Sequence, residues 1–288
     1  MWTALAFTAA IASATNGIID KHLIKRVPYM MVALGGFAAS LPFLIVVLMV
    51  SGIPRVDSLF WFGAVGTSLL NILATWLSFK ALSLEDASFL APIAAFNPVV
   101  TSIVSMFTLR EFPSLFGAVG IVSIGIGALL LGRTKQKKFH TSFINLFSNK
   151  SVQYMLVCYL IWSVTPSLEK TAVLHTSNGS PVLLALVSTT LLSLGIVPFV
   201  YRRRKELLSS LQGNFGWFGV LGILTVVGEV AVFTAFTLTN VAYVTAVFKT
   251  SMVFTVLFAG VFLRERGLAS RLLATAFMLV GVVLLSLE

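Results

Sequence analysis

The chain has 288 residues, of which 58% are hydrophobic and 10% are charged, and its mean hydropathy is +0.99. Soluble domains carry about 25% charged residues, so this composition excludes an ordinary soluble protein. The formal net charge of +10 could indicate nucleic-acid binding. The basic residues lie in short loops at the ends of apolar segments, however, which is typical of a membrane orientation signal and argues against nucleic acid as a partner.

Apolar segments of about 20 residues, each long enough to cross a bilayer, follow one another along the chain. We expect ten spans, at 2–20, 30–50, 59–82, 87–108, 114–132, 152–168, 181–200, 215–238, 241–263 and 268–286. The first span begins without a basic region or a cleavage site, so we expect no removable signal peptide. The single cysteine, Cys158, lies inside a span, which excludes a disulfide within the chain and predicts a small buried side chain.

The basic residues are distributed unequally between the two sides of the membrane that ten spans define. The loops after spans 1, 3, 5, 7 and 9 share one side, and they hold all but a few of the Lys and Arg residues. The other side holds Arg55, Arg110 and Lys170. The positive-inside rule places the basic loops in the cytoplasm. We therefore expect a multi-pass protein of the cytoplasmic (plasma) membrane with both termini outside.

Short motifs recur in the same order in the two halves of the chain, at a nearly constant shift. The motif Trp-Phe-Gly-x-x-Gly at 61–66 recurs at 217–222, Leu-Arg-Glu at 109–111 recurs at 263–265, and Asp20-Lys21 is mirrored by Glu169-Lys170. The shifts are 156, 154 and 149 positions. We expect the two Leu-Arg-Glu turns to be tight helical hairpins, each with its glutamate at the start of the next helix.

Each half contains five spans, and an odd number forces the second half to enter the membrane upside down relative to the first. The predicted fold is therefore an all-α integral membrane protein with ten transmembrane helices in two inverted five-helix repeats. The predicted boundaries are 1–132 for the first repeat, 133–151 for a basic linker and 152–288 for the second repeat. Inverted repeats are typical of secondary transporters, which bind substrate near the bilayer midplane.

The segment Ala87-Ser88-Phe89-Leu90-Ala91-Pro92, with Asn97-Pro98, Leu109-Arg110-Glu111 and the glycine-rich span from Gly117 to Gly127, resembles the EamA-type repeat of the drug/metabolite transporter superfamily. This resemblance covers nearly the whole chain in two copies, and it implies ten helices and the transport of small metabolites. A more distant similarity lies at Phe248-Lys249-Thr250-Ser251. The related triose-phosphate translocators carry a Lys-Arg pair at about this place in span 9, and this pair holds a phosphate. Here Thr250 replaces the second basic residue. The chain is also distantly similar to the nucleotide-sugar translocators.

Two charged residues lie deep inside predicted spans, Glu229 in span 8 and Lys249 in span 9. A Lys at the centre of a transmembrane helix is unfavourable by roughly 2.5–3.5 kcal/mol on insertion scales. Counted from the connection at Thr239-Asn240, both residues lie roughly 13–16 Å deep. They could form a structural ion pair, or face a cavity and bind a substrate or a coupling proton. A Lys in a cavity favours an anionic carboxylate or phosphate group.

Polar and aromatic side chains in other spans are further candidates for a substrate site. Amides within spans most often hydrogen-bond across helices, and helix breaks at matching positions of two repeats indicate a binding site. We expect such breaks at Asn16-Gly17, Asn97-Pro98 and Thr165-Pro166. The remaining substrate-binding candidates are Asn71, Trp76, Trp162 and Tyr243.

The sequence contains no string typical of an intramembrane enzyme, a metal centre or an ATPase, so we expect neither catalysis nor a cofactor. The favoured function is secondary active transport of a small metabolite by alternating access, by a monomer or homodimer. One alternative is an exporter of amino acids or amphiphilic compounds in which Lys249 and Glu229 are purely structural. Another is a non-transporting membrane scaffold or sensor.

Overall fold

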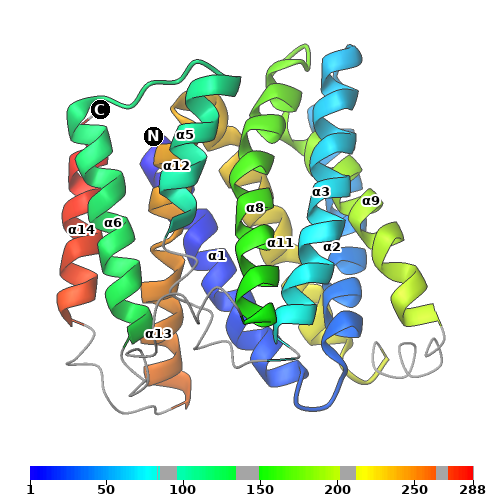
Figure 1. Cartoon of the computed structure of the whole chain (residues 1–288). Coiled ribbons are helices and arrows are strands. Elements are labelled where there is room, and N and C mark those ends of the chain that lie inside the picture. The colour runs from blue at the N-terminus through cyan, green and yellow to red at the C-terminus, as the bar shows by residue number, and fades with distance from the viewer. Residues whose placement is uncertain (83, 85–95, 134–148, 202–211, 264–271, 288) are drawn as a thin grey trace. The chain divides into compact units, whose positions relative to one another are not determined.

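The structure is a computed structural model that describes residues 1–82, 84, 96–133, 149–201, 212–263 and 272–287. These residues form eleven helices and contain no β-strand (Figure 1). The helices are α1 (Trp2–Leu23), α2 (Tyr29–Ser51), α3 (Ser58–Leu82), α5 (Asn97–Thr108), α6 (Leu115–Arg133), α8 (Lys150–Leu174), α9 (Pro181–Val200), α11 (Phe215–Leu238), α12 (Val241–Phe248), α13 (Ser251–Leu263) and α14 (Leu272–Ser286). Most of the predicted linker, 133–151, lies outside the described residues.

The helices follow the predicted spans closely, with two differences that bear on function. The helix α8 continues to Leu174, beyond the predicted end of its span at 168, so Glu169 and Lys170 belong to the helix and not to a loop. The predicted span 241–263 is divided into α12 and α13, with Lys249 and Thr250 between them. The helices α1 and α8 run without interruption through Asn16-Gly17 and Thr165-Pro166, so the breaks expected there are not found.

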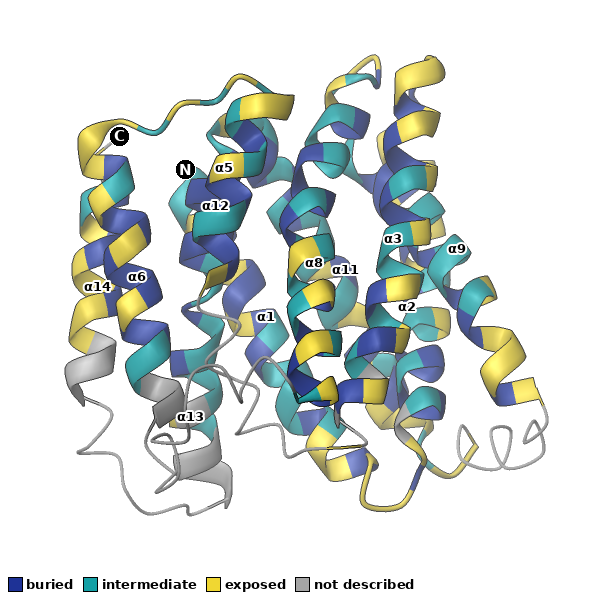
Figure 2. Ribbon diagram, viewed as in Figure 1, coloured by how far each residue is buried: buried dark blue, intermediate teal, exposed yellow. Residues whose placement is uncertain are grey.

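The surfaces of the helices are those of a protein that contacts lipid. Five of the described helices, α1, α2, α3, α9 and α11, are long and apolar enough to cross a membrane. The shorter helix α6 exposes Leu115, Val119, Val122 and Ile126 at helical spacing. Its opposite face is buried, as the alternation of colours along α6 in Figure 2 shows. A helix whose exposed stripe consists of large apolar residues is stable in hydrocarbon and not in water.

The chain forms two compact units, and each unit combines parts of both halves of the sequence. Unit 1 comprises Met1–Ile72 and Leu168–Leu238, and unit 2 comprises Leu73–Ser167 and Thr239–Glu288. The helices α3 and α8 contribute to both units, because the boundaries fall inside them.

In unit 1, α11 packs against α1, α2 and α9, and α2 also packs against α9. The helices α11 and α2 approach closely at Gly222, where an added Cβ would lie 2.6 Å from the carbonyl oxygen of Ala39. The ring of Phe218 fills the space beside Gly35, which also has no side chain. Small residues at such crossings allow van der Waals contact between helices, which is the main attraction available in a bilayer.

In unit 2, α6 packs along α14, and α12 packs against α5 and α6. The α6–α14 crossing joins Gly120 to Gly281: a Cβ on Gly281 would lie 2.6 Å from the carbonyl oxygen of Gly120. The hydroxyl of Ser123 donates a hydrogen bond of 2.8 Å to the carbonyl oxygen of Phe277 across the same interface. The two backbones therefore meet directly, without intervening side chains.

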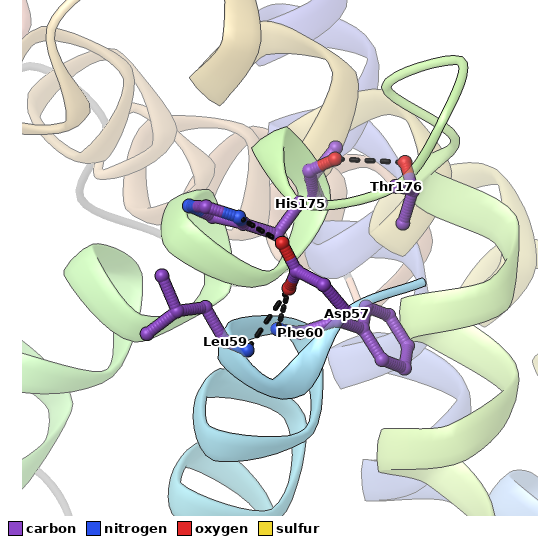
Figure 3. A network of polar contacts seen from close by, with 6 residues as sticks. Asp57, Leu59, Phe60, His175 and Thr176 are labelled. Carbon is purple, nitrogen blue, oxygen red and sulfur yellow. Dashed lines mark hydrogen bonds and ion pairs between the residues drawn. The ribbon is translucent and has the colours of Figure 1, made fainter. Parts of the chain in front are cut away.

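The loops before α3 and after α8 are joined by polar contacts in unit 1 (Figure 3). The Asp57 carboxylate accepts hydrogen bonds from the backbone N–H groups of Leu59 and Phe60 at the start of α3, and it contacts Nδ1 of His175 at 2.7 Å. These hydrogen bonds, with the one to His175 the strongest influence, lower the pKa of Asp57 from its ordinary value. The backbone N–H of Ser177 also donates to the carbonyl oxygen of Arg55 at 2.9 Å.

The Leu109-Arg110-Glu111 turn differs from the predicted arrangement. Arg110 adopts a φ of 55°, which reverses the chain direction after α5. The Oε2 atom of Glu111 accepts a hydrogen bond of 3.0 Å from the backbone N–H of Val241, so this glutamate lies at the start of α12 and not of α6. The hydroxyl of Ser114 accepts from the N–H of Gly117 at the start of α6. The second Leu-Arg-Glu turn extends beyond the described residues.

Candidate functional site

Lys249 lies at an interruption between two short helices of unit 2. The ordinary i−4 hydrogen bonds of a helix are tightened here, because the N–H groups of Thr250, Met252 and Val253 donate to carbonyl oxygens three residues earlier. The Thr250 hydroxyl also donates to the carbonyl oxygen of Val247 at 2.7 Å. An interrupted helix at membrane depth is tolerated where it is buried in protein or lines a cavity, and transporters often form their substrate sites at such helices.

The first repeat begins a helix at the position that corresponds to this interruption. The shift of 154 positions places Asn97 opposite Ser251, and these are the first residues of α5 and α13. The residues that correspond to α12, 87–94, lie outside the described part of the chain. The sequence predicted matching breaks in the two repeats, and of the three breaks that it proposed, only the one at Asn97-Pro98 coincides with the start of a described helix.

An aromatic side chain of α8, Tyr159, lies next to the Lys249 ammonium group. Lys249 is half-buried, and its Nζ atom lies 5.6 Å from the centroid of the Tyr159 ring, within the range of a cation–π interaction. The Tyr159 ring in turn packs edge-on against Trp162, with 5.5 Å between the ring centroids. We call Lys249, Tyr159, Trp162 and Asn97 the Lys249 site.

Asn97 fixes the start of α5 against α8. Its Nδ2 atom donates to the Ser163 hydroxyl at 2.8 Å and to the carbonyl oxygen of Tyr159 at 3.3 Å. The Ser163 hydroxyl donates to that carbonyl oxygen as well, at 2.8 Å. Asn97 therefore forms hydrogen bonds across two helices, as amides within spans most often do. These bonds join the start of α5 to the backbone of α8 at Tyr159.

The other predicted residues of unit 2 lie apart from these contacts or are engaged in packing. Thr165 is buried in α8, whereas Trp76 is an exposed side chain of α3. Tyr243 is buried between α12 and α6, where its hydroxyl accepts from the backbone N–H of Ser114 at 3.0 Å. Gly117 leaves the space that the Tyr243 hydroxyl fills. The contacts of Tyr243 are therefore those of a residue that joins two helices.

Unit 1 contains two half-buried glutamates that are held by threonine hydroxyls. Glu229 on α11 accepts from the Thr189 hydroxyl at 2.9 Å, and Glu169 on α8 accepts from the Thr67 hydroxyl at 2.8 Å. Asn71 donates to the same Thr67 oxygen at 3.2 Å. The two carboxyl groups lie close enough to interact electrostatically. We call Glu229, Glu169 and their three polar partners the acidic cluster.

The predicted ion pair between Glu229 and Lys249 joins residues of different units, so it stays a prediction. Within its own unit, each residue has another partner: a threonine hydroxyl for Glu229 and an aromatic ring for Lys249.

A cavity of about 200 Å³ in unit 1 contains another of the predicted residues, Asn16. The Asn16 Nδ2 atom donates to the Thr225 hydroxyl at 3.3 Å, and Asp20 lies one turn further along α1 on the same cavity wall. The sequence did not predict roles for Asp20, Glu169 or Tyr159. The repeat had aligned Asp20 with Glu169, but both residues were assigned to span ends, and an aromatic residue in an apolar span carries no distinctive signal.

Three or more His, Cys, Asp or Glu residues do not come together as a metal site anywhere in the described part of the chain. Its free cysteine, Cys158, is fully buried, and the thiol donates to the carbonyl oxygen of Ala74 at 3.3 Å.

The profile of the EamA-like transporter family matches residues 1–133 and 149–287, nearly the whole chain. The chain belongs to the EamA-like transporter family. This membership makes it a member of the drug/metabolite transporter superfamily and an integral membrane protein of a transporter family.

Solved structures show the same fold as this EamA-like protein. One of them, described only as "Crystal structure of protein", has a TM-score of 0.72 and 16% sequence identity, and the alignment covers 99% of this chain and 96% of the other. In all, 29 solved chains match. No curated protein matches the chain in sequence.

Proposed function

We propose that this EamA-like protein is a secondary active transporter that moves a small metabolite across the cytoplasmic membrane by alternating access. The observation that carries the proposal is the position of Lys249 at an interrupted helix, beside Tyr159 and Trp162. The Lys249 ammonium group, next to the Tyr159 ring, can bind an anionic substrate. We propose a substrate with a carboxylate or phosphate group.

Contacts between loops support ten alternating spans. The 52–57 loop contacts the 175–180 loop, and Glu111 contacts Val241. With ten alternating spans, both members of each of these pairs lie on the outer side of the membrane. Ser151 donates to the carbonyl oxygen of Ala81, and His22 packs on Trp217 with 5.5 Å between ring centroids; these pairs belong to the cytoplasmic side. A single missed span between the members of a pair would put them on opposite faces of the bilayer.

Packing between corresponding helices supports the inverted repeat. The helix α2 packs on α9, α5 on α12, and α6 on α14. Each pair joins the same span of the two repeats, which is the arrangement that a two-fold axis between the halves produces. The boundaries 1–132 and 152–288, the cytoplasmic basic loops and the external termini belong to this proposal.

The cation–π contact of Lys249 favours one alternative, in which the lysine is held structurally and the protein exports amino acids or amphiphilic compounds. Thermal stabilisation of the purified protein by a panel of metabolites separates the two. We expect monocarboxylates or phosphorylated compounds to raise the unfolding midpoint, and Lys249→Ala to abolish the effect. Stabilisation that persists in Lys249→Ala would contradict a substrate site at this lysine.

Uptake into proteoliposomes tests the coupling and the function itself. We propose that Glu229 carries a coupling proton, so Glu229→Gln should abolish uptake driven by a pH gradient while exchange of substrate for substrate continues. Intact pH-driven uptake in this variant would exclude the proton-carrier role. The absence of flux for every ligand that stabilises the protein would favour a scaffold or sensor over a transporter.

A further inference from the structure

The cavity in unit 1 that Asn16 lines also contains a carboxyl group that has no partner among the described residues. Its walls come from α1, α2 and α11, and its polar residues are Asn16, Asp20 and Thr225. Among the described residues that line it, Asp20 is the only charged one. No described residue donates a hydrogen bond or forms an ion pair with the Asp20 carboxyl. The structure thus leaves this acid facing the cavity.

The position of Asp20 on its helix makes a bound cation more favourable. Asp20 lies in the last turn of α1, which ends at Leu23, and its backbone carbonyl oxygen accepts from the N–H of Ile24. The partial negative charge at a helix C-terminus adds to that of a carboxylate. A half-buried carboxylate at this place is stabilised when a cation binds beside it.

A second polar group in the cavity has acceptor capacity that the protein does not use. The Oδ1 atom of Asn16 is buried and has no hydrogen-bond partner in the part of the chain that the structure describes, while Nδ2 of the same side chain donates to Thr225. Buried polar atoms are normally paired. The cavity thus has three groups with oxygen acceptors: the carboxyl of Asp20, the amide of Asn16 and the hydroxyl of Thr225. An ammonium group offers three N–H donors, which match these acceptors in number.

The rest of the wall is apolar, which argues for an organic cation over a bare metal ion. It consists of Val32, Ala33, Gly36, Phe37 and Leu221. A hard metal ion requires six or more oxygen ligands in most sites, and three polar side chains do not supply them. A cavity of about 150 Å³ holds benzene, so a volume of about 200 Å³ suits an amine with an apolar group of that size.

We infer that the cavity formed by Asn16, Asp20, Thr225 and their apolar neighbours is a binding site for a small primary alkylammonium ion. The ammonium group pairs with the Asp20 carboxylate and donates to Asn16, while the alkyl group packs on Phe37 and Leu221. This site goes beyond the proposed anion site at Lys249, and it shares no residue with it.

The test is the thermal unfolding of the purified full chain with n-butylammonium chloride as the probe. We expect a saturable rise of about 2–4 °C in the unfolding midpoint, with no comparable rise from n-butanol or from sodium chloride at equal ionic strength. Asp20→Asn should abolish the rise. Glu169→Gln is the matched control, because the repeat places Glu169 at the same position as Asp20 but the structure gives it a hydroxyl partner; the rise should persist there.

Each other outcome overturns the inference. An equal effect of sodium chloride assigns the site to an inorganic ion, an equal effect of n-butanol assigns it to apolar binding alone, and no effect at all excludes the site. If Asp20→Asn does not fold, Gly36→Ala decides: its Cβ would lie 3.7 Å from Leu221, so it fits while narrowing the cavity. An unchanged concentration dependence in Gly36→Ala contradicts the site. Lys249→Ala should keep the butylammonium effect even if the transport proposal fails.

Discussion

The two units hold their intramembrane charges in different ways. In unit 1, Glu169 and Glu229 lie on uninterrupted helices, and each accepts a hydrogen bond from a threonine hydroxyl of a neighbouring helix. In unit 2, Lys249 lies where the helix is interrupted, against the face of an aromatic ring.

The difference follows from what a helix can offer to each kind of group. A carboxyl group needs donors, and a threonine can present one from any helix without disturbing the backbone. An ammonium group needs acceptors, and the carbonyl groups in the middle of a helix are already occupied. A backbone interruption or an aromatic face is one way to accommodate a lysine inside such a protein, and Lys249 in unit 2 lies at both.

The sharpest test of this comparison is Lys249→Met. Removing a charge that insertion scales place at roughly 2.5–3.5 kcal/mol unfavourable should raise the unfolding midpoint, while flux in proteoliposomes should fall about tenfold or more because the substrate loses its counter-charge. Lys249→Arg is the matched control, since it keeps the charge. A variant that is both more stable and fully active would show that Lys249 has no part in transport.

The support of the acidic cluster is tested by Thr67→Val, which keeps the shape of the side chain but removes the donor to Glu169. Loss of this donor to the half-buried carboxyl group should destabilise the protein by about 1–3 kcal/mol, measured by denaturant or thermal unfolding in detergent. Thr67→Ser retains the hydroxyl and should behave nearly as the unchanged protein. Equal stability of the two variants would mean that the hydroxyl contributes nothing to holding Glu169.

A smaller effect is expected when the hydrogen bonds beneath the Lys249 site are removed. Asn97→Ala should destabilise the protein by about 0.6–2 kcal/mol, the range of polar contacts between membrane helices. A double-mutant cycle with Ser163→Ala measures the coupling directly. Independent, additive effects of the two substitutions would contradict the contact between Asn97 and Ser163.

Asp57 provides an exposed carboxylate with which the buried ones can be compared. The pKa of Asp57 is lower in the folded protein than in the unfolded chain. Its contribution to stability is therefore fully present above the unfolded pKa of about 4. This contribution is lost as the pH falls through the lower pKa of the folded state. We expect the difference in unfolding midpoint between the unchanged protein and Asp57→Asn to be small at pH 7 and to shrink below pH 4. A difference that grows on acidification would contradict the assigned contacts.

The sequence predicted the helices well because apolar length and polar loops determine them directly. The start of α9 at Pro181 and the end of α11 at Leu238 fall where the sequence placed them. The same rule failed at Glu169, since a charge in an apolar run was taken as the end of a span. The residue that accommodates this charge, Thr67, is about a hundred positions away, and no local pattern indicates such a partner.

Helix interruptions were harder to predict for a related reason. Pro166 and Gly17 are helix-breaking types, yet α8 and α1 continue through them, because neighbouring helices can compensate for weakened backbone bonding in a membrane protein. The interruption at Lys249-Thr250 contains neither proline nor glycine. The Thr250 hydroxyl donates there to the carbonyl oxygen of Val247, a contact that the residue types alone do not predict.

The composition of the two units sets an order of assembly during synthesis. All segments of unit 1 precede Thr239, whereas unit 2 still lacks α12, α13 and α14 at that point. Chains fold as they emerge from the ribosome, with the earlier parts first. Unit 1 can therefore close while the ribosome is still translating, and α6 must wait, its glycine face uncovered, until α14, the last described helix, is inserted beside it.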